Sequence, residues 1–185
     1  MMGQNNKIAP FSALDPGGYN TVSNGYGHLV CGNYNGIFEG RGNQVTGGGF
    51  SGIFSGEDNI IDRTTGGYIA CGYNAMLGGI GNKMCNTTNY SILAGGARNC
   101  IVDGYGEFMG AGVDNCIISN GFHSMNVLAG GCLNSISSSY SAVISGGCQN
   151  SVSADMSFVG SGCKNVVSQP YSGIASGCTN SVCGS

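Results

Sequence analysis

The chain has 185 residues, and charged side chains make up only 8% of them, against about 25% in an average soluble domain. It contains 36 glycines but 3 prolines, and the glycines follow no three-residue period, which excludes a collagen triple helix. The net charge of −3, with 6 Lys and Arg side chains, excludes nucleic acid as a partner, because phosphates require clustered basic residues. Since no apolar run approaches the roughly 20 residues of a membrane span, we expect a chain that does not itself cross a membrane.

Asparagine recurs along the chain at a regular spacing. Thirteen asparagines, from Asn6 to Asn180, stand mostly 15 or 16 residues apart, with two intervals of only 8. An apolar residue follows each of them two positions later, and glycine precedes twelve of them by three positions. A second apolar position lies six residues before most of them, as at Leu93 and Ile144. The chain is therefore built from a repeat of about 15 to 16 residues.

The residues around the two apolar positions favour strands over helices. They are β-branched, aromatic or serine, as in the runs SAVIS and SFVGS. Glycine at this density costs about 1 kcal/mol per helical site, and the apolar spacing is not helical. Each repeat therefore predicts strand, turn, strand, turn.

In chain order, the first irregularities are two half-length units, at 35–42 and 74–81. Each keeps the Gly-x-x-Asn-x-apolar pattern but has a single apolar position. We expect each half-unit to shift the register of the repeats that come after it. The N-terminal units also carry most of the aromatic residues, including Tyr19, Tyr26 and Phe50.

The longest unit comes next, at 115–133. Its extra residues predict a loop insertion near 119–127, and inserted loops of repeat proteins often form a binding face. Phe122, His123 and Met125 are therefore candidates for a recognition loop, although a loop that merely bulges outward is the simpler interpretation. The units from residue 134 onward are regular, and residues 1–185 are expected to form a single repeat domain.

One repeat cannot bury its own apolar residues, so the repeats must stack. Stacking in register places equivalent residues about 4.8 Å apart and predicts an all-β parallel β-solenoid. Asparagine at a fixed turn can then bond to the asparagine of the next repeat and form a ladder. Two apolar side chains per repeat make a thin core, from which we expect a homo-oligomer. The members of the predicted ladder in the regular part of the chain are Asn99, Asn115, Asn134, Asn150, Asn165 and Asn180.

The runs Asn134-Ser-Ile-Ser, Asn150-Ser-Val-Ser and Asn180-Ser-Val resemble a known family. They look like the head repeats of trimeric autotransporter adhesins of the YadA type, and similar repeats occur in phage and giant-virus fibre proteins. The resemblance implies a left-handed parallel β-roll, a homotrimer and a place on a cell or virion surface. The chain departs from the adhesin pattern in its slightly longer repeat and in its cysteines.

The 10 cysteines follow the repeat. Residues stacked one repeat apart have Cα atoms near the 4.4 to 6.8 Å range of disulfides, although parallel Cβ directions are not ideal. The alternative is a set of reduced thiols that pack as small apolar groups. The candidate disulfides pair Cys100 with Cys116, Cys132 with Cys148, and Cys163 with Cys178.

The sequence offers little for catalysis or for a metal. Its only histidines, His28 and His123, lie in distant repeats, and the carboxylates are scattered. No Cys-x-x-Cys pair occurs, and ligands in a straight column cannot surround a zinc ion tetrahedrally. We therefore expect no enzyme activity, no metal and no cofactor.

These patterns favour an extracellular fibre head or adhesin. Such a rod, on a cell or virion surface, would attach to a host receptor, a glycan or the extracellular matrix through many repeated weak contacts. A purely structural shaft of a fibre or virion is the alternative. An ice-binding solenoid is a further one, although no threonine ladder is present.

Overall fold

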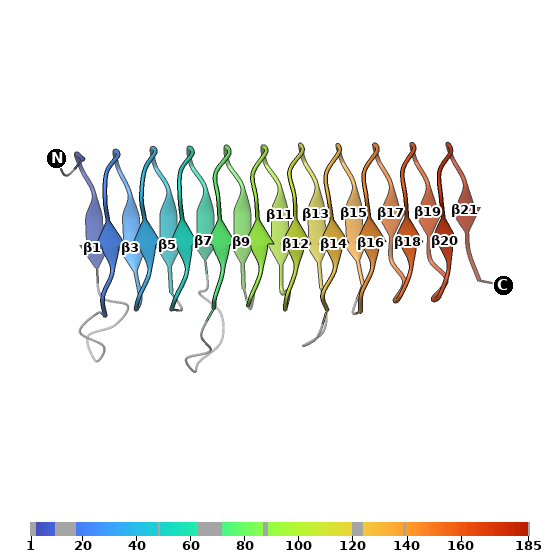
Figure 1. The fold of residues 1–185 in the computed structure, drawn as a ribbon, viewed down its shortest axis with the longest axis horizontal. Coiled ribbons are helices and arrows are strands. Elements are labelled where there is room, and N and C mark those ends of the chain that lie inside the picture. The colour runs from blue at the N-terminus through green and yellow to red at the C-terminus, as the bar shows by residue number, and fades with distance from the viewer. Residues whose placement is uncertain are drawn as a thin grey trace.

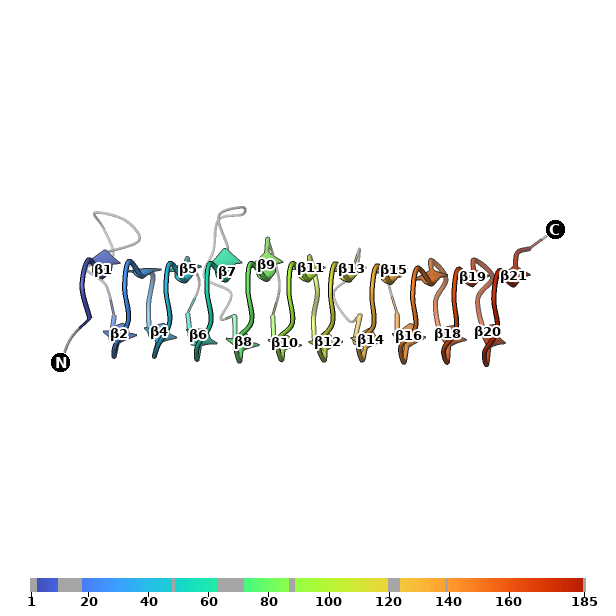
Figure 2. The ribbon, with the colours of Figure 1, turned by 90° about the horizontal axis from the view of Figure 1, so that it is seen from above.

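The computed structural model describes residues 3–9, 18–47, 49–62, 72–86, 89–119, 124–138 and 140–184. These residues contain no helix, and their strands form two parallel sheets that extend along a rod (Figure 1). Consecutive strands alternate between the two sheets, so each turn of the chain, called a rung below, adds one strand to each sheet (Figure 2). The predicted parallel β-solenoid is confirmed.

Within the described residues, the first sheet has eleven strands and the second has ten. The strands of the first sheet are β1 (Lys7–Ala9), β3 (Leu29–Cys31), β5 (Gln44–Thr46), β7 (Ile60–Asp62), β9 (Lys83–Cys85), β11 (Cys100–Val102), β13 (Cys116–Ile118), β15 (Ser135–Ser137), β17 (Ser151–Val152), β19 (Val166–Val167) and β21 (Ser181–Val182). The strands of the second sheet are β2 (Thr21–Val22), β4 (Gly36–Ile37), β6 (Gly52–Ile53), β8 (Ala75–Met76), β10 (Ile92–Leu93), β12 (Phe108–Met109), β14 (Val127–Leu128), β16 (Val143–Ile144), β18 (Phe158–Val159) and β20 (Gly173–Ile174).

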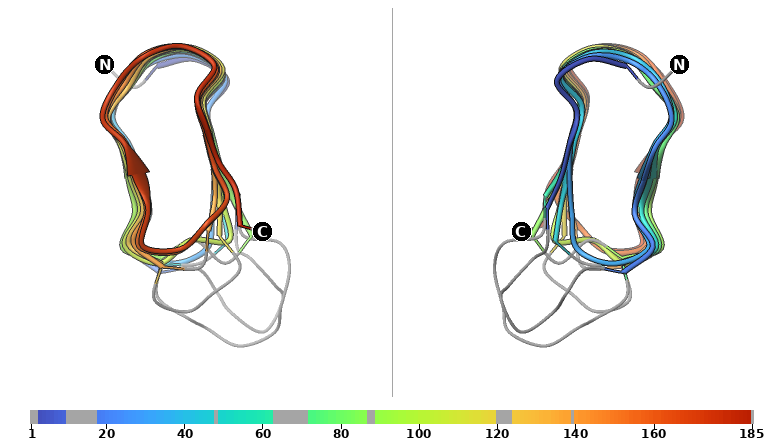
Figure 3. Two further views of the ribbon diagram at one scale, coloured as in Figure 1. Left: turned by 90° about the vertical axis from the view of Figure 1, so that its right-hand side faces the viewer. Right: turned by 90° about the vertical axis from the view of Figure 1, so that its left-hand side faces the viewer.

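The coil is left-handed. Figure 3, left, looks along the rod from the C-terminal end, and there the chain turns clockwise as it advances toward the viewer. The same view shows a flattened rung, with the two sheets on its long sides. This agrees with the handedness that the adhesin resemblance implied.

The core is a double column of apolar side chains between the two sheets. In each rung one residue of the first sheet, such as Ile117, faces inward toward one of the second sheet, such as Leu128, and both are fully buried. Their neighbours in the next rung are directly in register, as Ile117 pairs with Ile136 and Leu128 with Ile144. The two apolar positions of the sequence repeat are therefore the two core columns.

The repeated glycine stands at the turn that leads from the second sheet into the first, called the first corner. At Gly112, φ is 119°, and a Cβ would lie 2.2 Å from the carbonyl oxygen of Gly131. Both the backbone conformation and the close approach of the next rung thus require glycine.

The half-units at 35–42 and 74–81 do not shift the stack as expected. Asn35 and Asn74 precede β4 and β8 of the second sheet, whereas Asn43 and Asn82 precede β5 and β9 of the first. The second sheet continues in register through β4, β6 and β8. The 8-residue interval is therefore one half of an ordinary rung, in which asparagine happens to stand at both corners.

Candidate functional site

The six predicted ladder asparagines all stand at the first corner and form a hydrogen-bonded column. The backbone N–H of each donates to the side-chain Oδ1 of the asparagine one rung earlier, as from Asn115 to Asn99 at 3.0 Å and from Asn150 to Asn134 at 2.9 Å. The side-chain amide Nδ2 also donates to the glycine carbonyl of the next rung, as from Asn134 to Gly147 at 2.9 Å. All six except Asn180 are buried. This column is structural, because buried amides that are fully bonded present nothing to a ligand.

His28 occupies the same column, in a rung where the sequence pattern found no asparagine. Its backbone N–H donates to Asn6 Oδ1 at 3.0 Å, and its Nδ1 accepts the backbone N–H of Asn43 at 3.2 Å. The side chain is 1% exposed, and its Nε2 has no hydrogen-bond partner. Burial lowers the pKa of this imidazole, partly offset by backbone groups of Asn24, Asn43 and Gly40. The sequence favours a surface or turn position for His28 over a role as a base; the residue does stand at a turn, but it is buried there.

The second corner, which leads from the first sheet into the second, carries a mixed polar column that the sequence pattern did not reveal. Its members share the position directly before a strand of the second sheet and bond from rung to rung, as Ser91 N–H donates to Asn74 Oδ1 at 3.1 Å. Asn, Ser and Glu can all accept here, so no single letter repeats. The column includes Asn35, Ser51, Asn74, Ser91, Glu107 and Asn126.

Glu107, which is 1% exposed, holds the two ends of the predicted loop insertion near 119–127. Its carboxylate accepts the Ser119 hydroxyl at 2.6 Å and the Asn126 backbone N–H at 2.7 Å. Of the proposed recognition residues, Phe122 and His123 lie outside the described residues. Met125 is 57% exposed beside the second corner.

None of the three candidate disulfides is formed in the structure. The nine cysteines among the described residues are free thiols, and all but the exposed Cys178 and Cys183 are half-buried. The strand register nevertheless stacks the predicted pairs directly. Cys100 pairs with Cys116, and the backbone bridges run from Cys132 through Cys148 and Cys163 to Cys178. The reduced-thiol alternative is therefore the state that the structure shows.

Cys85, Cys100 and Cys116 form a group of hydrogen-bonded thiols on the outer face of the first sheet. The interaction with the Cys100 thiol raises the pKa of Cys85 together with burial, and the Cys85 thiol donates to the carbonyl of Ile101 at 4.0 Å. The hydrogen bond from Cys100 to Cys116 raises the pKa of Cys100 to about 11 and lowers the pKa of Cys116. Cys116 is thus the sulfur on which negative charge is best accommodated.

A row of aromatic side chains runs along the second corner. Adjacent rings lie 4.7 to 5.4 Å apart between centroids, and those of Tyr34 and Phe50 are stacked within 2° of parallel. Because the ring faces are covered by neighbouring rings, the row presents ring edges and tyrosine hydroxyls to solvent. The sequence showed these aromatics only as an N-terminal excess. The row consists of Tyr19, Tyr34, Phe50, Tyr73, Tyr90 and Tyr105.

The two sheets differ on their outer faces. Among the described residues, the strands of the second sheet and the residues directly after them carry no charged side chain facing outward. Bulky apolar residues stand in register on this face, as Ile92 pairs with Phe108, and Val143 with Phe158. Phe108 and Phe158 are 39% and 47% exposed. We call this surface the apolar face.

In the rungs of β4 to β18, the apolar face combines one bulky and one small residue, whereas the β20 rung carries only Gly173 and Ala175. Phe54 stands two positions after Gly52, and Phe108 stands two positions before Gly110. The bulky residue comes second in the rungs of β4, β6 and β8, and first in those of β10 to β18. The face therefore has two columns of complementary size.

The outer face of the first sheet is mixed in chemistry. It carries amide, hydroxyl, thiol and charged side chains among apolar ones, including Gln44, Lys83 and Ser135. Beside it, a shallow polar hollow of about 260 Å³ is lined mainly by serines and Asp155. Asp155 accepts hydrogen bonds from the Ser138 hydroxyl and the Tyr140 N–H, both at 3.0 Å.

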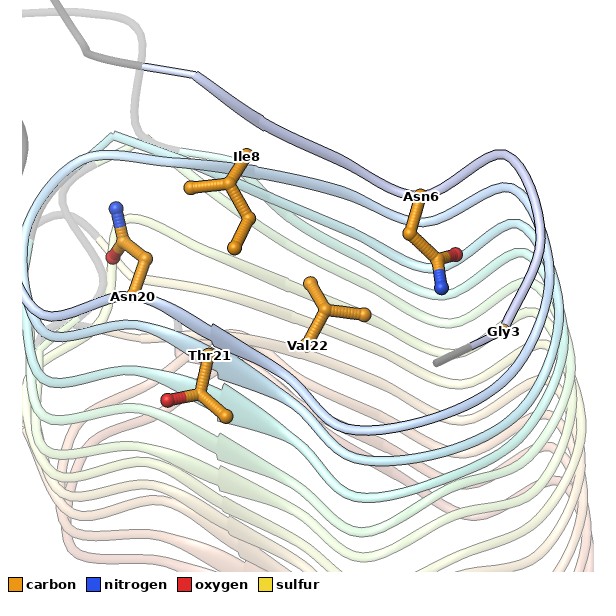
Figure 4. Close-up of a pocket in the computed structure, with 6 residues that line it drawn as sticks. All are labelled: Gly3, Asn6, Ile8, Asn20, Thr21 and Val22. Carbon is orange, nitrogen blue, oxygen red and sulfur yellow. The ribbon is translucent and has the colours of Figure 1, made fainter. Parts of the chain in front are cut away.

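A second hollow, of about 350 Å³, lies at the first described rung (Figure 4). Ile8 and Val22 point into it from the two sheets, and Asn6 and Asn20 lie at its two ends. It is the space between the sheets, continuous with the core, and holds no convergent set of reactive side chains.

Within the described ranges, no group of three or more His, Cys, Asp or Glu side chains is arranged to hold a metal ion. No helix long and apolar enough to cross a membrane is found in the same residues. Comparison with protein-family models and with curated proteins found no match for this chain.

Proposed function

We propose that the chain is a non-enzymatic rod of a surface fibre, which assembles with copies of itself through the apolar face and displays its other surfaces for attachment. The observation that carries this proposal is the unequal chemistry of the two outer faces. An uncharged face on which Phe108 and Phe158 are exposed is unfavourable in contact with water. The outer face of the first sheet carries polar and charged side chains that water solvates well.

A second copy of the chain is the partner that fits the apolar face best. The strands of both copies repeat at about 4.8 Å, so contacts made at one rung recur at every rung. The paired bulky and small columns let a bulky residue of one copy pack beside a small residue of another. Following the adhesin resemblance, we propose a homotrimer.

The displayed surfaces would attach to a host receptor, a glycan or a matrix component, outside the cell or on a virion. The rungs repeat at a fixed spacing, and each copy in the assembly adds further rungs. Many weak contacts to one surface therefore combine into a high overall affinity. The purely structural shaft remains the second candidate, because the same assembly would serve it.

The mass of the purified chain in solution, measured by light scattering, tests the assembly. Three times the chain mass of 18.7 kDa is expected. A monomer at micromolar concentration would contradict the proposal. Attachment is tested by binding of the assembled rod to cell surfaces, glycan arrays and matrix proteins, and assembly without any such binding would favour the structural shaft.

A further inference from the structure

The thiols of Cys85, Cys100 and Cys116 differ from the other described cysteines in their surroundings. They lie on β9, β11 and β13, three consecutive strands of the first sheet, where Cys100 is the direct partner of Cys116 and Cys85 lies diagonally from Cys100. Lys83 is the direct strand partner of Cys100, and its ammonium favours the thiolate forms of Cys85 and Cys100. Cys116 lies one strand farther from Lys83 and has the thiol of its direct partner Cys100 as the donor that favours its thiolate form.

The register limits which of the three thiols can form a disulfide. Cys100 and Cys116 are direct partners, so their Cα atoms stand about one strand spacing, about 4.8 Å, apart, inside the disulfide range. Cys85 pairs with Val102, two positions along the strand from Cys100. The diagonal from Cys85 to Cys100 is about 8 Å between Cα atoms, which is outside that range.

We propose that Cys116 and Cys100 form a thiol–disulfide exchange site for small-molecule disulfides, with Cys116 as the attacking sulfur and Cys100 as the resolving one. The Cys116 thiolate attacks one sulfur of a disulfide R–S–S–R, forms a mixed disulfide and releases one thiolate RS⁻. The Cys100 sulfur then attacks the Cys116 sulfur, the second thiolate leaves, and the Cys100 proton passes to a released thiolate. The products are a Cys100–Cys116 disulfide, one thiol RSH and one thiolate RS⁻, so that R–S–S–R is reduced as the pair is oxidised.

The disulfide would cross-link two successive rungs on the face that self-assembly leaves open. Parallel partners hold their Cβ atoms at about the strand spacing, wider than the 3.5 to 4.5 Å preferred in disulfides. The bond is therefore expected to be reducible, as exposed or strained disulfides are.

Oxidised glutathione tests the site on the full chain. A Cys178→Ser/Cys183→Ser background removes the two thiols that are exposed among the described residues. After brief reaction and alkylation of the remaining thiols, peptide mass spectrometry should find the Cys100–Cys116 disulfide and no lasting glutathione adduct at either residue. Addition of Cys100→Ser should trap glutathione on Cys116, earlier than on the half-buried Cys132, Cys148 and Cys163. Cys85→Ser is the matched control and should still give the disulfide.

Adducts spread evenly over the half-buried cysteines, or no adduct on Cys116 in the Cys100→Ser variant, would overturn the proposal. A second measurement needs no substitution and so does not depend on variant folding. In the unmodified chain, iodoacetamide should label Cys116 at a lower pH than Cys148, and equal pH profiles for the two would equally refute the assignment.

Discussion

The ladder asparagine is the residue that joins one rung to the next at the first corner. Asn134 alone accepts the backbone N–H of Asn150 and donates to the carbonyls of Gly130 and Gly147, at 2.9 to 3.1 Å. Neighbouring Asn150 is 1% exposed, so water does not replace a lost partner. One amide thus satisfies the Asn150 N–H and the Gly130 carbonyl, and it gives a second donor to the Gly147 carbonyl, which also accepts the Cys132 N–H at 3.0 Å.

Replacement of Asn134 by alanine is therefore expected to lower the free energy of unfolding by about 2–4 kcal/mol, the cost of leaving buried polar groups unpaired. Urea denaturation followed by circular dichroism measures this change. Ser153→Ala, at an exposed position after β17, is the control and should change stability little. Equal effects of the two substitutions would show that the ladder bonds contribute nothing.

His28 makes the same ladder sensitive to acid. The Nδ1 atom accepts a hydrogen bond only while it carries no proton. Burial holds the pKa of the His28 imidazole in the folded chain below the ordinary value of 6.5. The groups that face the ring are the Asn6 and Asn43 amides and the backbone of Asn24 and Gly40, and no charged side chain contributes to its pKa.

Since the unfolded chain takes up this proton more readily, the stability contributed by neutral His28 is present above about pH 6.5 and is lost as the pH falls toward the lower pKa of the folded state. The His28→Asn variant restores the ladder residue and should lose less stability than the unmodified chain between pH 7.5 and pH 5. Urea denaturation at both values measures the difference. If the two chains lose stability in parallel, His28 is not the titrating group.

At the scale of elements, the two corners have different tolerances. The first corner is fixed by glycine and by the carbonyl of the next rung, as at Gly112. The second corner is more permissive, because Asn, Ser or Glu supplies an acceptor ahead of the strand in most rungs and the buried Ala142 takes that place before β16. The long unit 115–133 has its extra residues at this corner. Glu107 closes the base of that insertion by accepting from both Ser119 and Asn126.

The Glu107→Gln substitution keeps the size of the side chain but turns one acceptor into a donor, so one of the two ends loses its partner. Amide hydrogen exchange at Asn126 should become faster, and stability should fall by about 1–3 kcal/mol. The matched control is Glu57→Gln at the half-exposed first corner, where Arg41 is the ion-pair partner at 3.5 Å. Unchanged exchange at Asn126 would argue against Glu107 as the anchor.

At the scale of the whole molecule, each rung contacts only the rungs directly before and after it. The stability and the surfaces of the rod therefore repeat along its length. The core columns are buried within one chain from Val30 to Ile174, whereas bulky residues of the outer columns of the second sheet, such as Phe108, are exposed. We propose on this basis that the second sheet serves assembly and the first sheet serves display.

Aspartate introduced on the apolar face should separate the copies. Phe108→Asp combined with Val143→Asp places charge in two rungs of the proposed interface, where burial of an unpaired carboxylate is strongly unfavourable. The mass by light scattering should fall to that of one chain. Ser137→Asp on the first sheet is the control and should leave the mass unchanged. Loss of assembly in the control alone would place the interface on the first sheet instead.

The sequence by itself determined the period, the two apolar columns and the glycine corner. These features follow from strict local requirements. A Cβ at Gly112 has no space, and an apolar residue such as Ile117 must point into the space between the two sheets to be buried. The ladder from Asn99 to Asn180 was predictable for the same reason, because a short amide both accepts and donates at that corner.

Only the tertiary structure decided which sheet each asparagine serves. Asn35 and Asn43 look alike in sequence but stand at opposite corners, because the same Gly-x-x-Asn-x-apolar pattern suits either turn. Sequence did not reveal the place of His28 in the ladder, the role of Glu107 or the row from Tyr19 to Tyr105. At each of these positions, residues of different types make the same kind of contact, so no single residue type repeats. The apolar face and the grouping of Cys85 with Cys100 and Cys116 depend on register between rungs, and register is set by stacking, which no single repeat contains.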